Sequence, residues 1–121
     1  MKKILIFVAS IIVAVFSAYG AGDGGEKVIP FADPFIYCED GTYYLYGTGS
    51  EEGIAVAVSK NLKTWEWPQG KEMYLALHKD DSYGDHWFWA PEVYKVGGRY
   101  IMYYSAEEHI CMAESSSPLG P

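Results

Sequence analysis

Residues 33–46 read DPFIYCEDGTYYLY, and residues 90–103 read APEVYKVGGRYIMY. A shift of 57 residues places Pro34 on Pro91, Gly41 on Gly98, Tyr43 on Tyr100 and Tyr46 on Tyr103. A shift of 56 then places IAVA, residues 54–57, on ICMA, residues 110–113. A repeat of this length is typical of stacked or radial arrays of similar units. Because the counterpart of Asp33 is Ala90, the repeat needs no acid at that position, and Asp33 becomes a candidate for chemistry.

The pattern within each unit predicts short antiparallel strands joined by tight turns. In the first unit we expect strands over residues 35–38, 42–48 and 54–59, and a last strand that carries Trp65 and Trp67. In the second unit we expect strands over residues 92–96, 99–105 and 110–115. Gly41 and the pair Gly97-Gly98 supply the positive φ that tight hairpin turns need. Beyond residue 20 no helix is expected.

Four-stranded meanders at a fixed period are typical of the blades of a β-propeller. We therefore predict an all-β fold in which the chain supplies the first blade and most of the second blade of a propeller. Since propellers usually have four to eight blades packed on one another, we interpret residues 21–121 as the N-terminal part of a longer propeller, truncated here. Expressed alone, this part is expected to aggregate or to fold poorly.

The first twenty residues have the pattern of a secretory signal peptide. Lys2 and Lys3 give a basic start, residues 4–16 are apolar except for Ser10, and small residues precede a cut after Gly20. The apolar run is too short to span a membrane, and no Cys follows it for lipid attachment. We expect export to a periplasm or to the outside, with no membrane anchor.

The charge of the chain excludes some partners. The formal net charge is −7, and loss of Lys2 and Lys3 would take it to −9. A chain this acidic has no basic surface for nucleic acid or anionic lipid. Its 11 Tyr and 4 Trp can pack in strands or, where exposed, stack on sugar rings, and packing is the more frequent role. The oligomeric state is left open.

The remaining titratable residues predict no metal centre. Cys38 and Cys111 sit at different places in their units, so we expect two partly buried free thiols rather than a disulfide, although export would permit one. The three His are scattered without zinc spacing. The acidic run over residues 80–85 could bind calcium, but it lacks the spacing of a calcium loop and is more typical of a solvated loop. Residues 68–88 form a long irregular segment of the kind that often carries function.

Asp33 and the segment around Trp89 are the candidate site residues. A residue before proline is expected to be extended, which would hold Asp33 rigidly at the start of a strand; the alternative is that Asp33 only opens a turn. In the second unit, Trp89 and its aromatic neighbours could form a sugar-binding surface beside Glu92, or could pack between blades. The repeat partner of Glu92 is Phe35, which favours a structural role for Glu92.

With these residues in place, the sequence resembles glycoside hydrolase family 43. The matching segments are residues 32–34 (ADP), 40–48 (DGTYYLYGT), 58–65 (VSKNLKTW), 89–93 (WAPEV), 99–105 (RYIMYYS) and 113–121 (AESSSPLGP). They occur in the order of the family and cover most of the chain beyond residue 20.

The resemblance implies a five-bladed propeller that hydrolyses arabinose- or xylose-containing glycans of plant type with inversion. It implies that Asp33 is the general base and that Trp89 lines the sugar pocket. Glu92 is not the acid of the family; we keep it only as a weak candidate for substrate binding. The other two carboxylates, a general acid and an Asp that tunes it, are expected beyond residue 121. No cofactor is implied, and a calcium ion in the channel of the full-length protein is left open.

Two rival functions remain. One is a propeller lectin that binds pentose glycans without cleaving them. The other is a fructan-cleaving enzyme with a retaining Asp nucleophile, but the asparagine that usually precedes the aspartate-proline pair in that group is Ala32 here. The choice among arabinose, xylose and galactose is left open.

Overall fold

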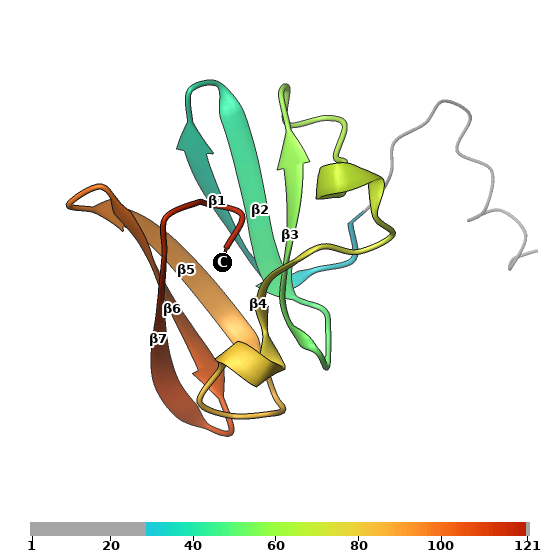
Figure 1. Ribbon diagram of the computed structural model, residues 1–121. Helices are drawn as coiled ribbons and strands as arrows, with labels where there is room; N and C mark the ends of the chain where they lie inside the picture. The colour runs from blue at the N-terminus through green and yellow to red at the C-terminus, as the bar shows by residue number, and fades with distance from the viewer. Residues whose placement is uncertain (1–28, 121) are drawn as a thin grey trace, which may run out of the picture.

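The computed structural model describes residues 29–120, which form two antiparallel β-sheets (Figure 1). The first sheet contains β1 (Ala32–Glu39), β2 (Thr42–Thr48), β3 (Gly53–Ser59) and β4 (Leu75–His78), in that order. The second contains β5 (Trp89–Val96), β6 (Arg99–Ala106) and β7 (His109–Ser115). The predicted all-β class is therefore confirmed. The predicted signal peptide lies outside the described residues.

The connection between β3 and β5 carries the only helical turns among residues 29–120. They are the short 3-10 helices η1 (Pro68–Gly70) and η2 (Lys79–Asp81). No helix in the described part of the chain has the length and apolarity required to cross a membrane. The expectation of a chain without helices thus needs a small correction, since two single turns are present.

The hairpins of the two sheets are built alike, as the repeat predicts. The turn between β1 and β2 has φ of 48° at Asp40 and 69° at Gly41, and the turn between β5 and β6 has φ of 58° at Gly97 and 83° at Gly98. Two consecutive positive φ values give a turn whose twist matches that of the flanking strands. These turns fix the register of each hairpin.

The predicted fourth strand of the first sheet is wrong. The alternation around Trp65 and Trp67 gives only one isolated bridge, between Glu66 and Val58, because Pro68 follows at once and starts η1. The edge position is taken instead by β4, which pairs with β3. Trp67 is buried against the outer face of the first sheet, where it meets Phe31 edge-on at 5.8 Å between ring centroids. The segment that we expected to be irregular therefore contains a strand.

The two sheets pack on one another through a shared apolar core. Side chains from the facing surfaces of both sheets form it, among them Tyr46, Ile54, Val56, Val93, Tyr100, Met102 and Tyr104. β5 lies beside β1 and β2 at the centre of the fold (Figure 1). Polar contacts join the sheets at one end, because Lys95 and Tyr100 both donate hydrogen bonds to the carboxylate of Glu39. These hydrogen bonds hold the pKa of the Glu39 carboxyl below its usual value, and the one from Lys95 has the largest effect.

The far face of the second sheet carries apolar side chains that nothing in the described chain covers. Ile54 and Val56 of the first sheet are 0% exposed, whereas their repeat counterparts Ile110 and Met112 are 90% and 59% exposed. The two sheets therefore carry apolar side chains at equivalent positions on one face, and only those of the first sheet are buried.

Both cysteines are free, as predicted. Cys111 is buried, but Cys38 is exposed rather than partly buried. The reason is strand alternation, since Cys38 of β1 points away from the face that carries Phe35 and Tyr37.

Gly53 at the start of β3 is expected to tolerate no side chain. Its φ is 142°, and a Cβ there would overlap the carbonyl oxygen of Leu77 in β4. We expect Gly53→Ala to lower the free energy of unfolding by about 1–3 kcal/mol, the range for a residue forced into sparse backbone geometry, as measured by urea denaturation of the intact protein.

The matched control is Gly41→Asn. Gly41 has φ of 69°, and a Cβ added to it would have no atom within 4 Å, while Asn adopts the left-handed region readily. We expect a change within about 0.5 kcal/mol. Equal losses at the two positions would contradict the close approach of β3 and β4 as the cause.

Candidate functional site

Asp33 lies in a β-bulge at the start of β1. The pairing with β2 shifts register between Ala32 and Phe35, and the φ of Asp33 is 47°. The expected extended geometry is therefore wrong: the extra residue of the bulge takes the left-handed conformation despite the following proline. Asp is among the residues that adopt this conformation at low cost.

The second sheet repeats the bulge without the acid. In β5 the register shifts between Trp89 and Glu92, and Ala90 has φ of 46°. Ala has no polar side chain that could stabilise this conformation by a local hydrogen bond, and the conformation costs an L-residue roughly 1–2 kcal/mol. The shared bulge is therefore a feature of the architecture, and the carboxylate of Asp33 is an addition to it.

Thr48 joins the two bulges. Its hydroxyl donates to Oδ2 of Asp33 across 3.3 Å and accepts a hydrogen bond from the backbone N–H of Ala90 across 3.0 Å. One side chain at the end of β2 thus fixes the Asp33 carboxylate relative to the start of β5. Asp33 itself is exposed, so its second carboxylate oxygen is open to solvent.

A small hollow of about 160 Å³ opens beside Thr48. It is lined by Thr48, Gly49, Ser50, Glu51, Trp87, Phe88 and Trp89. This is below the roughly 300–1,000 Å³ of pockets for drug-sized ligands. The structure therefore brings Asp33 and Trp89 to one place, with Thr48 between them.

Glu92 does not line this hollow. It is exposed on β5, and its Oε2 accepts a hydrogen bond from the Tyr94 hydroxyl at 2.7 Å. Its strand partner is Tyr103, as the partner of Phe35 is Tyr46, so Glu92 and Phe35 are equivalent positions, as the repeat predicts.

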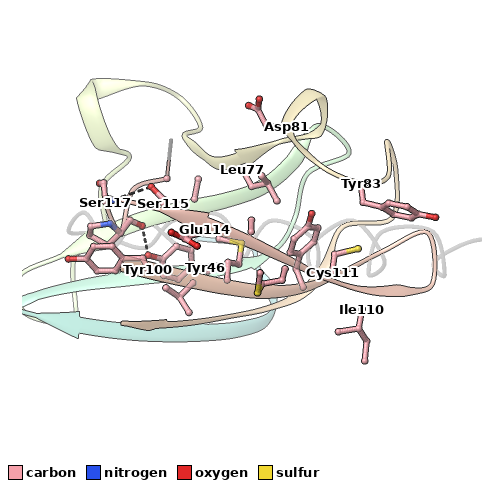
Figure 2. Close-up of a pocket in the computed structure, with 18 of the residues that line it drawn as sticks. Tyr46, Leu77, Asp81, Tyr83, Tyr100, Ile110, Cys111, Glu114, Ser115 and Ser117 are labelled. Carbon is pink, nitrogen blue, oxygen red and sulfur yellow. Dashed lines mark hydrogen bonds between the residues drawn. The ribbon is translucent and has the colours of Figure 1, made fainter. Parts of the chain in front are cut away.

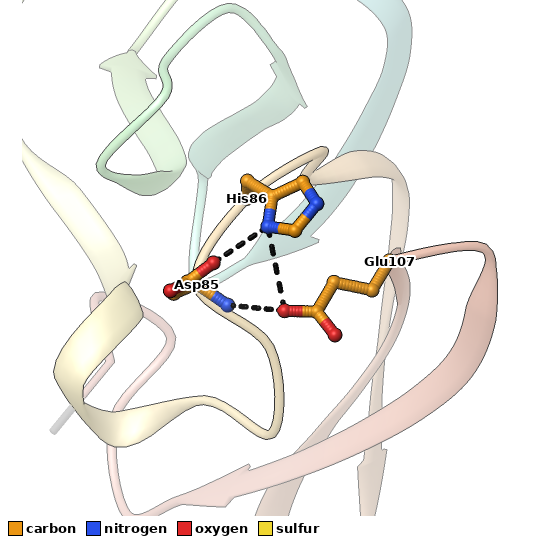
Figure 3. A group of neighbouring side chains, drawn as sticks. All are labelled: Asp85, His86 and Glu107. Atoms are coloured by element: carbon orange, nitrogen blue, oxygen red, sulfur yellow. Dashed lines mark hydrogen bonds and ion pairs between the residues drawn. The ribbon is translucent and has the colours of Figure 1, made fainter.

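Asp85, His86 and Glu107 form a hydrogen-bonded group (Figure 3), and His86 also contacts the ring of Trp87. His86 Nδ1 lies 2.5 Å from Asp85 Oδ1 and 3.4 Å from Glu107 Oε1, and the backbone N–H of Asp85 donates to Glu107 Oε1 at 3.1 Å. Their ligand-type atoms lie within 4.8 Å of one another, but each is used in holding the other two. Of the acidic run over residues 80–85, only Asp85 takes part.

The two acidic partners of His86 shift the pKa of its imidazole. The hydrogen bond with Asp85, supported by the negative charge of Glu107, raises the pKa of His86 above its usual value of about 6.5. Because the folded protein binds this proton more tightly, the resulting stabilisation is complete below the unfolded pKa and is lost as the pH rises through the folded pKa.

We expect proton NMR of the intact protein to show the raised pKa at His86, and we expect Asp85→Asn to lower it. The matched variant Asp81→Asn removes a nearby exposed carboxylate outside the group and should leave the titration of His86 in place. A pKa of His86 that Asp85→Asn leaves unchanged would contradict the hydrogen bond as its cause.

A larger cavity, of about 620 Å³, lies between the sheets. Figure 2 shows it with Tyr46 and Tyr100 toward one end and Tyr83 toward the other. Two of its hydroxyl groups are already engaged, since Tyr46 donates to the carbonyl of Pro118 and the Tyr104 hydroxyl lies 2.8 Å from Ser82 Oγ. It contains neither Asp33 nor the exposed tryptophans, so we do not take it as the site.

Sequence reasoning included Trp87 among the aromatic neighbours of Trp89 but missed Thr48 and the histidine group. Thr48 had a usable signal: the Asp40-Gly41 turn fixes the register of the first hairpin, and continuing that register along both strands brings Thr48 opposite the start of β1. Glu107 had none, because it lies in the turn after β6 and reaches His86 only through the packing of the second sheet.

Known proteins resemble this chain in sequence and in structure. The sequence profile of glycosyl hydrolases family 43 matches residues 28–121. An extracellular exo-α-(1→5)-L-arabinofuranosidase of Cellvibrio japonicus is 33% identical over 84 residues, which is 67% of this chain and 23% of that protein.

Two solved structures share the fold. An endo-1,4-β-xylanase from Bacteroides thetaiotaomicron is 46% identical with a TM-score of 0.68, over 77% of this chain and 32% of that one. A thermostable family 43 glycoside hydrolase is 32% identical with a TM-score of 0.65, over 82% and 33%. The chain thus spans about a quarter to a third of these relatives. On the profile match and the 33% identity together, the chain belongs to glycosyl hydrolases family 43.

Proposed function

We propose that the protein carrying this chain hydrolyses O-glycosidic bonds in arabinose- or xylose-containing glycans with inversion, and that Asp33 is its general base. The observation that carries the proposal is the unequal pair of bulges: the same backbone feature holds Asp33 in one sheet and Ala90 in the other. The architecture does not require a carboxylate at this position. That of Asp33 is hydrogen-bonded to the Thr48 hydroxyl, and Thr48 and Trp89 both line the hollow.

The contacts of Asp33 suit the removal of a proton from water. Thr48 donates to Oδ2, which leaves Oδ1 to accept the proton as the water oxygen attacks the anomeric carbon. The leaving oxygen takes a proton from an acid on the opposite side of the sugar, roughly 6.5–9.5 Å from the base in inverting enzymes. We assign no residue among 29–120 to this acid, nor to the Asp that tunes it.

The wider architecture in this proposal is a five-bladed propeller with the two sheets as its first blades. Two observations support it. The buried surface of the first sheet recurs, exposed, on the second at Ile110 and Met112, so a third sheet could pack there as the second packs on the first. The relatives are also three to four times longer than the matched part.

Residues 21–121 would then be the N-terminal part of that propeller, and residues 1–20 a cleaved leader. The name of the Cellvibrio relative, an extracellular enzyme, supports export. The arabinofuranosidase and xylanase relatives support a glycan substrate rather than nucleic acid.

The test is hydrolysis by the protein expressed from its complete natural reading frame. We expect release of nitrophenol from an α-L-arabinofuranoside or a β-D-xyloside, and an NMR time course in which the first sugar released has the inverted anomeric configuration. Retention would contradict the role of Asp33 as base. Glycan binding without any release would establish the lectin alternative instead.

A further inference from the structure

Trp87 extends the aromatic surface beyond Trp89. The two indole rings are nearly parallel, with an interplanar angle of 16° and 5.9 Å between ring centroids. Both are exposed at the mouth of the hollow beside Thr48, Trp87 by 46% and Trp89 by 40%. The pair is an offset stack, in which the rings cover each other only in part, so each indole leaves part of its face exposed in a stepped aromatic surface.

The backbone holds Trp87 in this place at a cost. Its φ is 59°, a left-handed conformation that is unfavourable for a bulky residue by roughly 1–2 kcal/mol. Phe88, between the two tryptophans, is buried in the core, whereas both of its neighbours are exposed. Conformational strain that persists at the surface is a reason to look for a function at that residue.

The side chain of Trp87 is also fixed from behind. The imidazole of His86 contacts the indole edge-on, with 4.5 Å between centroids and 74° between planes. His86 is in turn held by Asp85 and Glu107 (Figure 3). Three residues thus orient one exposed ring, which is the arrangement expected of a preformed binding surface.

Resting on the proposed function, we propose that Trp87 binds a second sugar residue, adjacent to the one at the hollow beside Trp89. The ligand is a neutral oligosaccharide of at least two sugars, whose C–H faces lie on the two indoles. The charges around the surface favour a neutral chain, because Glu51 lines the hollow and Asp85 and Glu107 lie behind Trp87. Sugars that carry carboxylates would be repelled.

The experiment compares one-sugar and many-sugar substrates in the protein expressed from its complete natural reading frame. A glycosyl fluoride offers one sugar and no second ring, whereas a trisaccharide offers both. For Trp87→Ala we expect the ratio of kcat/KM for trisaccharide to kcat/KM for glycosyl fluoride to fall at least tenfold, mostly through KM. Trp87→Phe should recover part of the loss, since a flat ring remains.

The matched control is Tyr83→Ala, which removes another exposed aromatic ring, 72% accessible, outside the hollow. It should leave the ratio within twofold. An unchanged ratio in Trp87→Ala, with melting temperature retained, would overturn the second subsite. If the unmodified protein cleaves neither substrate, the proposed function fails. Calorimetric titration with the trisaccharide then decides the subsite: a loss of affinity in Trp87→Ala but not in Tyr83→Ala supports it, and equal affinity overturns it.

Discussion

Asp33→Asn in the intact protein is expected to lower kcat for glycoside hydrolysis by about 10²–10⁴-fold, the usual contribution of a general base. The amide can still accept the hydrogen bond from Thr48 across 3.3 Å, and Asn adopts the left-handed φ of this position as readily as Asp. The structural effect should therefore be small. Steady-state kinetics and circular dichroism melting of the same preparation separate the loss of chemistry from any loss of fold.

The chain supplies a matched control at Asp40. Asp40 is also exposed and has φ of 48°, against 47° for Asp33, but it lies in the hairpin turn at the other end of β1. Asp40→Asn makes the same chemical change in the same backbone geometry and should keep full activity. If both variants retain turnover within a few-fold, Asp33 is not the base. If both lose it equally, the effect comes from the strands rather than from the carboxylate.

The repeat in the sequence predicted the equivalence of the two bulges but not their conformation. The alignment of Asp33 with Ala90 depends only on residue types that recur at a fixed spacing, and β1 and β5 indeed carry the same register shift. The rule that a residue before proline is extended then gave the wrong φ for Asp33. The register of the hairpin requires an extra residue on one strand, and this requirement overrides the local preference for an extended residue before proline.

The parts of the site that escaped prediction depend on packing between distant segments. Thr48 contacts Ala90 across 42 residues, and Glu107 contacts Asp85 across 22. A single sequence holds no local signal for either contact, because the register of the first hairpin brings Thr48 only to the start of β1 and Glu107 would suit any exposed turn equally well. The same limit explains the misplaced fourth strand: the alternation at Trp65 and Trp67 satisfied strand periodicity, but only the packed sheet shows that β4 fills the edge.

Phe88→Ala is expected to cost about 3–5 kcal/mol of unfolding free energy in the intact protein, the range for removing a buried Phe. Phe88 is 1% exposed and lies in the core between the sheets. It is also the anchor from which both tryptophans point outward, so loss of its ring should loosen the surface that they form. Urea denaturation should show a lower midpoint with an unchanged slope, as for a change of stability alone.

Two variants show whether burial is the cause. Phe88→Leu keeps most of the apolar volume and should lose much less than the Ala variant. Tyr83→Ala removes a ring that is 72% exposed and should change stability within about 0.5 kcal/mol. A loss in Phe88→Ala no larger than in Tyr83→Ala would mean that Phe88 does not anchor the segment. The alternation of Trp87, Phe88 and Trp89 would then not be what holds the two indoles beside Asp33.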